Sequence, residues 1–322
     1  MQGKVLLEQS APTVYVGVDV CKEWLDVYLH PVGRALRVAN DREGLKQLKR
    51  ELAGHQVKLI VMEATAKYHR QAHRTLSAGG FAVAVVNPLR SRLFAEAAGA
   101  LAKTDRIDAK ILAILGESLA PDAKAPVPVA LEELQELFRA RAAAVAEMVA
   151  LTNRLGASEG AFLRAELVRR IKATQAHIER LDGEIHRQVG ADLALARRYA
   201  ILMSIPGVGP VAAMGLVLGL AELGTCSGKA ASHLAGLAPF ADDSGERTGI
   251  RFIQGGRAHV RTAIYMAAVA AVRCNPDLAA FYKRLRDHGK KPKVALTAVM
   301  RKLVVLANTL LKEDRLWQPV AP

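Results

Sequence analysis

The stretch VYVGVDV at residues 14–20 decides the fold of the first part of the chain. Valines recur at every second position over a length typical of a β-strand. Two further β-rich stretches follow within a few residues, WLDVYLH at 24–30 and residues 35–39. We therefore expect three short strands joined by tight turns.

Downstream of these strands, helical and strand patterns alternate. The expected elements are a helix at residues 41–53, a buried strand at 57–62, a helix at 67–78, a strand at 81–86 and a helical stretch that opens at Pro88. Short apolar runs such as VKLIVM are typical of parallel strands covered on both faces. Three strands followed by this alternation predict an α/β domain with a mixed sheet.

The pattern changes near residue 120, where the proline-rich stretch PDAKAPVPVA predicts a linker. Near-heptad apolar spacing at 131–155 and 167–189 predicts a coiled-coil-like helical hairpin. The rest of the chain is mostly helical. We therefore divide the chain into an N-terminal domain at residues 12–120, a linker and hairpin at 121–192, and a C-terminal domain at 193–315.

Composition favours a polyanionic partner and a reducing compartment. The 322 residues carry a formal net charge of +14, and Lys and Arg gain affinity for nucleic acid by displacing counterions from phosphates. The three cysteines fit neither a disulfide framework nor a zinc site. We find no apolar run expected to span a bilayer and no targeting signal. These features predict a cytoplasmic protein that acts on nucleic acid and not on a membrane.

Four acidic residues form a candidate metal site: Asp19, Glu63, Asp105 and Asp108. The first two end predicted strands, and the other two lie three residues apart on a predicted helix, in KTDRIDAK. Carboxylates at neighbouring strand ends converge on one edge of a sheet and suit Mg²⁺ or Mn²⁺. Taken singly, the aspartates are more often turn residues, caps or parts of a solvated helix face.

Four stretches, taken together, resemble the insertion-sequence-110 family of bacterial transposases, to which the Piv DNA invertase is related. These stretches are GVDVCKEWLDV at 17–27, VMEATAKY at 61–68, VNPLRSRLFAEAAGALAKTDRIDAK at 86–110 and GLAPFADDSGERTGIRFIQGGRAHVRTAIYMAA at 236–268. They occur in the family's order, and the resemblance covers nearly the whole chain.

This resemblance implies a RuvC-like N-terminal domain with an RNase H fold, in which the four acidic residues form a metal-binding DEDD tetrad. It implies a C-terminal domain whose nucleophile corresponds to Ser244. It further implies a dimer or tetramer with composite active sites, which cuts and rejoins donor and target DNA under the guidance of a structured bridge RNA. Without the resemblance, Ser244 would be interpreted as an ordinary loop serine.

Further residues are candidates for contacts with nucleic acid. SIPGVGPVAAMGLV at 204–217 resembles a helix-hairpin-helix, although a plain helix–helix turn has the same signature. Arginines after Ser244 could bind phosphate oxygens, and lysines near residue 290 could hold DNA or RNA. The candidates are Gly207, Gly209, Arg247, Arg251, Arg257, Arg261, Lys290 and Lys291.

Three alternatives to an RNA-guided transposase remain open. A Piv-like invertase would act between fixed DNA sites. A RuvC-like nuclease would use the acidic residues with water as the nucleophile and would form no covalent serine link. A non-enzymatic nucleic-acid-binding protein would keep the basic surfaces without using the acidic residues.

Overall fold

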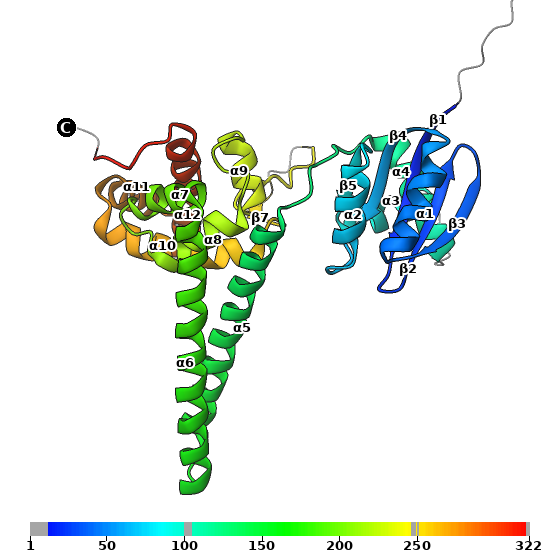
Figure 1. The fold of residues 1–322 in the computed structure, drawn as a ribbon. Coiled ribbons are helices and arrows are strands. Elements are labelled where there is room, and N and C mark those ends of the chain that lie inside the picture. The colour runs from blue at the N-terminus through cyan, green and yellow to red at the C-terminus, as the bar shows by residue number, and fades with distance from the viewer. Residues whose placement is uncertain (1–11, 100–104, 246–248, 250, 320–322) are drawn as a thin grey trace, which may run out of the picture. The chain divides into compact units, whose positions relative to one another are not determined.

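The computed structural model describes residues 12–99, 105–245, 249 and 251–319, without the side chains of residues 105 and 106. The chain divides into two compact units, Met1–Val127 and Pro128–Pro322 (Figure 1). Each unit has its own hydrophobic core, so each is described by itself.

The first unit is built on a five-stranded mixed sheet. Its strands are β1 (Thr13–Val20), β2 (Trp24–His30), β3 (Arg34–Ala39), β4 (Gln56–Glu63) and β5 (Val83–Val86). Their order in the sheet is β3-β2-β1-β4-β5. The first three strands pair antiparallel, and β4 runs parallel to both β1 and β5. The crossover from β3 to β4 therefore places β4 beside β1, in the centre of the sheet.

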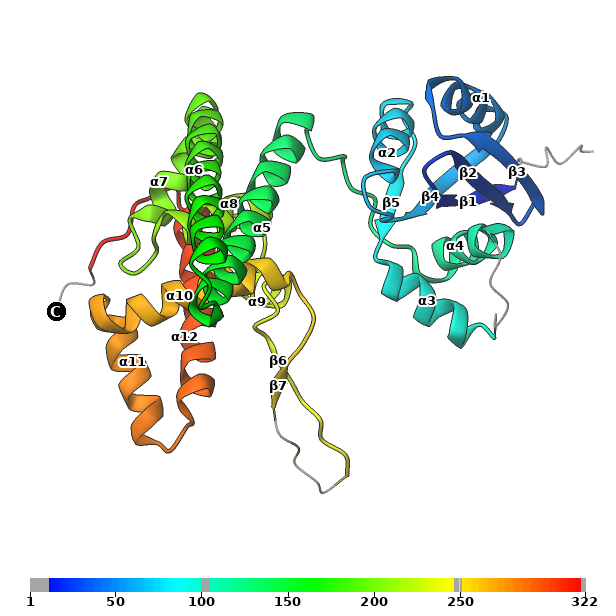
Figure 2. The same cartoon turned by 90° about the horizontal axis from the view of Figure 1, so that it is seen from below.

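Helices cover both faces of this sheet (Figure 2). The helices are α1 (Arg42–Ala53), α2 (His69–Ala78), α3 (Pro88–Ala97) and α4 (Asp105–Leu119). Leucines of α1 and α2 pack on the even-numbered valines of β1. On the other face, Leu112 and Leu115 of α4 and Phe94 of α3 pack on Leu59 and Val61 of β4. The alternation of valines along β1 thus sets which residues face α4.

This architecture confirms the expected α/β domain with a mixed sheet. Each predicted strand and helix of the first unit is present, with ends shifted by no more than about two residues, a normal uncertainty for element boundaries. The more specific assignment to the RNase H fold stays a prediction.

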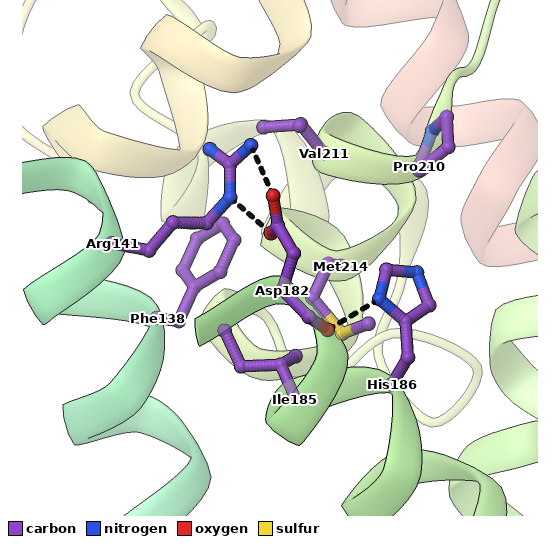
Figure 3. A pocket seen from close by; sticks show the side chains of 8 residues that line it. All are labelled: Phe138, Arg141, Asp182, Ile185, His186, Pro210, Val211 and Met214. Carbon is purple, nitrogen blue, oxygen red and sulfur yellow. Dashed lines mark hydrogen bonds and ion pairs between the residues drawn. The ribbon is translucent and has the colours of Figure 1, made fainter. Parts of the chain in front are cut away.

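The second unit begins with a long helical hairpin, formed by α5 (Val129–Ala157) and α6 (Ala161–Ala191). Arg141 of α5 forms a two-pronged ion pair with Asp182 of α6. This pair lines a cavity of about 230 Å³ where the hairpin meets helix α8 (Pro210–Gly219), next to His186 and Met214 (Figure 3). The two charges in this largely apolar cavity neutralise each other, so we assign it to helix packing.

Five further helices in the described residues, besides α8, build most of the core of this unit. They are α7 (Leu193–Met203), α9 (Gly228–Leu234), α10 (Ala258–Cys274), α11 (Pro276–Asp287) and α12 (Pro292–Lys312). Between α9 and α10, β6 (Pro239–Phe240) pairs antiparallel with β7 (Phe252–Ile253) and forms a narrow ribbon (Figure 2). The mostly helical character agrees with the prediction, and the ribbon was not predicted.

Helix α12 differs from the expectation that no segment is long and apolar enough to cross a bilayer. By length and composition alone, it is the one helix in the described residues that meets this criterion. Half of its most apolar window is buried within the protein, where Val299, Leu303 and Val304 belong to the core of the second unit. Its buried apolar residues are therefore used in packing against neighbouring helices.

Candidate active site

Asp19 and Glu63 lie side by side on the two central parallel strands. Val18 of β1 pairs with Met62 of β4, so the next residue on each strand is one of the two acids. Neighbouring strands are roughly 4.8 Å apart. Both carboxylates lie at the carboxyl ends of their strands, and both residues are half-buried. The sequence prediction that these two acids reach the same edge of the sheet therefore agrees with the strand register.

Both acids also lie on the face of the sheet that α4 covers. Side chains alternate between the faces of a strand, so Asp19 shares a face with Gly17, and Glu63 shares one with Val61. The α-carbon of Gly17 is in close contact with α4, since a Cβ there would lie 1.9 Å from the carbonyl oxygen of Ala109. Val61 packs on the same helix.

The amino-terminal end of α4 points towards the two acids. Ala109 and Ala113 lie over Gly17, whereas Gly116 lies over Tyr15, which is nearer the amino end of β1. The helix therefore runs antiparallel to β1, and its first turn reaches the edge where Asp19 lies. Asp105 begins this helix and Asp108 follows three residues later, half-buried. The side chain of Asp105 lies outside the described residues.

A fifth acidic residue, Asp26, lies on this face and was missed by the sequence analysis. It is directly opposite Asp19 in the antiparallel pairing of β1 and β2. Arg37 of β3 donates two hydrogen bonds to the Asp26 carboxylate, at 2.8 and 2.9 Å. The guanidinium neutralises Asp26, so this carboxylate does not add an uncompensated charge beside Asp19. The Asp26–Arg37 contact depends on how β2 and β3 pair in the folded chain, so it is not evident from the sequence.

Glu63 has a buried partner on helix α3. The Ser91 hydroxyl donates a hydrogen bond to Oε2 of Glu63, at an O–O distance of 2.6 Å. Ser91 is only 6% exposed. Nothing local in NPLRSRLF marks the fourth residue of a helix as the partner of a distant glutamate, so Ser91 is not predictable from the sequence.

The donor set at this edge has the chemistry that a hard divalent cation prefers, namely anionic oxygens. Among the described side chains, no group of three or more acidic, histidine or cysteine residues is gathered closely enough to hold a metal. Asp19 and Glu63 are adjacent, and Asp108 lies on the helix that ends beside them. The acidic residues therefore suit a divalent cation in type, and Asp19 and Glu63 are neighbours, but the described side chains do not form a set of three ligands.

Ser244 is exposed in the loop that joins β6 to β7. The base of this ribbon is held by Phe240, which stacks on Phe252 with ring centroids 6.5 Å apart. Next to the serine, Asp243 accepts hydrogen bonds from the backbone N–H of Gly249 at 3.0 Å and from Arg251 at 2.7 Å. These bonds, from Arg251 first, lower the pKa of the Asp243 carboxyl. Asp243 thus connects the two sides of the loop.

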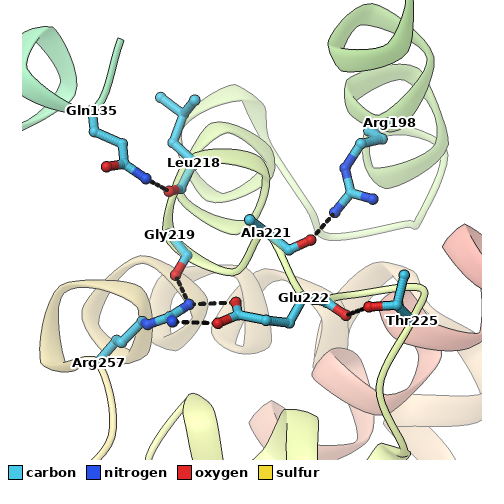
Figure 4. Close-up of polar contacts among 8 residues, drawn as sticks. All are labelled: Gln135, Arg198, Leu218, Gly219, Ala221, Glu222, Thr225 and Arg257. Atoms are coloured by element: carbon cyan, nitrogen blue, oxygen red, sulfur yellow. Dashed lines mark hydrogen bonds and ion pairs between the residues drawn. The ribbon is translucent and has the colours of Figure 1, made fainter. Parts of the chain in front are cut away.

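The candidate arginines differ in their surroundings. Arg257 donates to both carboxylate oxygens of Glu222, at 2.6 and 2.7 Å, and to the carbonyl oxygen of Gly219 at 2.7 Å (Figure 4). Arg261 donates to the carbonyl oxygen of Gly255 at 2.8 Å. Both guanidinium groups therefore hold the base of the ribbon to the helices. A phosphate contact by Arg257 would compete with its ion pair.

The remaining basic candidates are less constrained. Arg251 pairs with Asp243, but about half of its side chain is exposed. Lys290 and Lys291 are exposed in the loop between α11 and α12. Arg247 lies outside the described residues. Exposed lysines on a short loop can approach a phosphate. The binding of DNA or RNA by these two lysines stays a prediction.

The two glycines of the predicted helix-hairpin-helix differ as well. Gly207 has a φ of +96°, and a Cβ on it would lie 2.5 Å from Cα of Ala271 in α10. Gly209 precedes α8 as its N-cap, and a Cβ there would have no atom within 4 Å. Gly207 is thus required for packing, whereas Gly209 faces open space. The helix-hairpin-helix assignment stays a prediction.

Comparison with known protein families gives two matches. Residues 16–158 match a model described as a transposase and named for the DEDD enzymes of IS110, and residues 199–283 match the model "Transposase IS116/IS110/IS902 family". The chain belongs to the IS110 family of transposases. This confirms the resemblance stated from the sequence motifs. In this IS110-family transposase, the four acidic candidates lie within the segment matched by the first model, and Ser244 lies within the segment matched by the second.

Individual relatives of this IS110-family chain include both invertases and insertion-element proteins. It is 27% identical over 316 residues to the pilin gene-inverting proteins of Moraxella bovis and Moraxella lacunata, which covers 94% of this chain and 96% of each relative. It is 31% identical over 163 residues to an IS116 protein of Streptomyces clavuligerus, which covers 50% of this chain and 40% of that protein. The family is thus associated with rearrangement of DNA.

Proposed function

We propose that this IS110-family transposase cuts and rejoins DNA strands at a site formed by the acidic edge of its first unit and Ser244 of a second copy. The observation that carries the proposal is the placement of Asp19 beside Glu63, with the first turn of α4 directed at the same edge. Two adjacent carboxylates at one sheet edge supply the anionic oxygens that a hard divalent cation prefers.

Asp19, Glu63, Asp105 and Asp108 would hold Mg²⁺ or Mn²⁺. When bound, the metal would polarise a phosphodiester and stabilise charge on the entering and leaving oxygens. The protein itself supplies the rigid edge of the sheet. Arg37 neutralises Asp26, the acidic residue that faces Asp19 from β2.

Ser244 would act as the nucleophile. Its hydroxyl oxygen forms an ester bond to phosphorus, the bond from that phosphorus to one deoxyribose oxygen breaks, and the serine proton is lost as the released deoxyribose hydroxyl gains one. Attack by a hydroxyl of another strand reverses these changes and frees the serine. Each step replaces one phosphoester with another, so rejoining requires no nucleotide cofactor. Exposure of Ser244 in a glycine-containing loop allows a phosphate to approach.

The proposed partners are donor and target DNA, a structured bridge RNA from the same genetic element, and further copies of this chain in a dimer or tetramer. A net charge of +14 supports binding to nucleic acids. We propose that the protein acts in the bacterial cytoplasm, where its DNA substrates lie. Sequencing of RNA that copurifies from cells carrying the flanking DNA tests the guide. Recombination by RNA-free protein on DNA alone would exclude it.

Trapping of a protein–DNA adduct tests the chemistry. Denaturation of a reaction on labelled DNA should yield a covalent adduct, which Ser244→Ala abolishes and which the control Ser158→Ala, in the loop between α5 and α6, retains. Asp19→Asn should prevent strand cleavage, whereas Asp122→Asn in the exposed linker should not. Cleavage by Ser244→Ala at the wild-type rate would instead identify a nuclease that uses water.

A Piv-like site-specific invertase is the second candidate function. The full-length similarity to two proteins named as pilin gene inverters favours it. A plasmid with two candidate sites in inverted orientation distinguishes the two activities, because an invertase reverses the intervening segment whereas a transposase inserts an element into a new target. Activity in cells that is unchanged by Asp19→Asn would contradict both and favour a non-enzymatic binding protein.

A further inference from the structure

Ser91 is fixed against Glu63 by the way in which α3 begins. Glu63 pairs with Val86 in the parallel register of β4 and β5, and the backbone N–H of Ala64 donates to the carbonyl oxygen of Val86 at 3.0 Å. Helix α3 starts two residues later. Asn87 caps it by accepting from the N–H of Leu89 at 2.8 Å. The first turn of α3 is therefore anchored to the strand next to Glu63.

The Ser91 hydroxyl has two acceptors within reach. Its oxygen lies 2.6 Å from Oε2 of Glu63 and 3.0 Å from the carbonyl oxygen of Pro88. An ionised carboxylate and a carbonyl both lack a proton to give, so the single hydroxyl proton must serve these contacts. The shorter distance is to Glu63, which is typical of a charge-assisted O–H···O⁻ bond.

We propose that Ser91 is a positioning residue for the metal site. This role rests on the proposed function. The Ser91–Glu63 hydrogen bond would fix one carboxylate oxygen of Glu63, so that the other oxygen is directed towards the cation beside Asp19. A glutamate side chain has three rotatable bonds, and a buried partner that occupies one oxygen selects among its rotamers. Ser91 is 6% exposed, so water does not readily replace the lost donor.

Removal of the hydroxyl should weaken metal binding without unfolding the protein. Partners that orient metal ligands are worth roughly 10- to 100-fold in affinity. Full-length Ser91→Ala should therefore bind Mn²⁺ about tenfold more weakly, measured by electron paramagnetic resonance of free Mn²⁺. Strand cleavage should require about tenfold more Mg²⁺ for half-maximal rate and approach the wild-type rate at saturating Mg²⁺. Ser91→Thr keeps the hydroxyl and should restore wild-type affinity.

Ser77→Ala is the matched control, because Ser77 lies at the end of α2, which leads to the amino end of β5, whereas Glu63 lies at the carboxyl end of the parallel strand β4. It should leave Mn²⁺ affinity unchanged. Thermal unfolding of each variant shows whether a loss of binding reflects loss of the fold. Equal losses in Ser91→Ala and Ser91→Thr, or none in Ser91→Ala, would overturn the role of the hydroxyl.

Glu63→Gln separates this inference from the proposed function. If Glu63→Gln abolishes Mn²⁺ binding while Ser91→Ala binds normally, the metal site stands and only the positioning role fails. If Glu63→Gln binds Mn²⁺ as the wild type does, the metal site itself fails, and the role of Ser91 fails with it. Loss of affinity in both variants, with rescue by Ser91→Thr, supports both.

Discussion

At the scale of single residues, the site depends on positions that carry no reactive group. Gly17 has no side chain, and α4 therefore packs directly on the backbone of β1. This close approach brings the first turn of α4, with Asp105 and Asp108, to the edge where Asp19 lies. A glycine two residues before an acid is thus as much a part of the site's geometry as the acid itself.

Gly17→Ala should destabilise the first unit and impair cleavage. The new Cβ would lie 1.9 Å from the carbonyl oxygen of Ala109 and 2.5 Å from the backbone nitrogen of Ala113. Because backbone atoms cannot rotate away, we expect a loss of about 3 kcal/mol in the free energy of unfolding, the upper end for overpacking. Urea denaturation measures it. Gly54→Ala, whose Cβ would have its nearest neighbour at 3.6 Å, is the control and should change little.

His259 should remain neutral at pH 7. Partial desolvation of the ring, together with the charges of Arg257 and Arg139, lowers the pKa of its imidazole below 6.5. A titration followed by NMR should therefore give a midpoint below 6.5, and Arg139→Gln should raise that midpoint. Because the lowered pKa favours the neutral form in the folded state, its contribution to stability is present above pH 6.5 and is lost as the pH falls through the folded-state pKa. An unshifted midpoint would contradict the partial desolvation of the ring and the influence of the two arginines.

At the scale of elements, the turn between α7 and α8 contains two glycines with different surroundings, Gly207 in close contact with α10 and Gly209 in open space. Gly207→Ala should cost about 3 kcal/mol, since it combines a left-handed backbone with a close contact to Ala271. Gly209→Ala should cost at most about 1 kcal/mol, because that position is an open N-cap. Thermal unfolding compares the two. A larger effect of Gly209→Ala would show that the turn packs differently.

One of these variants, Gly209→Ala, also tests the helix-hairpin-helix prediction. If backbone N–H groups at the start of α8 contact a phosphate, Gly209→Ala should weaken DNA binding while the protein stays folded. Fluorescence anisotropy with a labelled duplex measures this affinity. Unchanged affinity would assign the turn to helix packing alone.

Much of the element structure was predictable from the sequence because its patterns are local. The strands of the first unit have a period of two or are continuously apolar, and the hairpin repeats nearly every seven residues. The β6–β7 ribbon was missed, because strands of two residues have no period to detect. The Asp26–Arg37 pair and the Ser91–Glu63 bond were missed for another reason. Both depend on strand or helix neighbours that only the folded chain brings together.

At the scale of the whole molecule, two units with separate cores are joined by an exposed linker. The backbone of Lys124 is bound to the first unit, where its N–H donates to the carbonyl oxygen of Val83 at 3.0 Å and its carbonyl oxygen contacts Nε2 of His73 at 2.9 Å. Helix α5 begins at Val129. The chain between these points, Ala125 to Pro128, has no regular secondary structure.

Limited proteolysis should therefore cut first between Ala125 and Val129. An exposed segment without regular secondary structure is a preferred site for proteolytic cleavage. Brief digestion with a protease of broad specificity, followed by mass spectrometry, should yield two fragments divided near residue 127 that each resist further digestion. Initial cleavage within α5 or within the sheet would contradict the division into two units.

The β6–β7 ribbon has a consequence for how such proteins diverge. Its base is secured by the Phe240–Phe252 stack, by Arg257 at the N-cap of α10 and by Arg261 within α10, and Ser244 is exposed in the loop between the two strands. Insertions or deletions in the loop that carries Ser244 would leave the hydrophobic interior of the helices undisturbed. Natural selection is therefore free to reshape the surroundings of the serine while the scaffold that carries it stays constant.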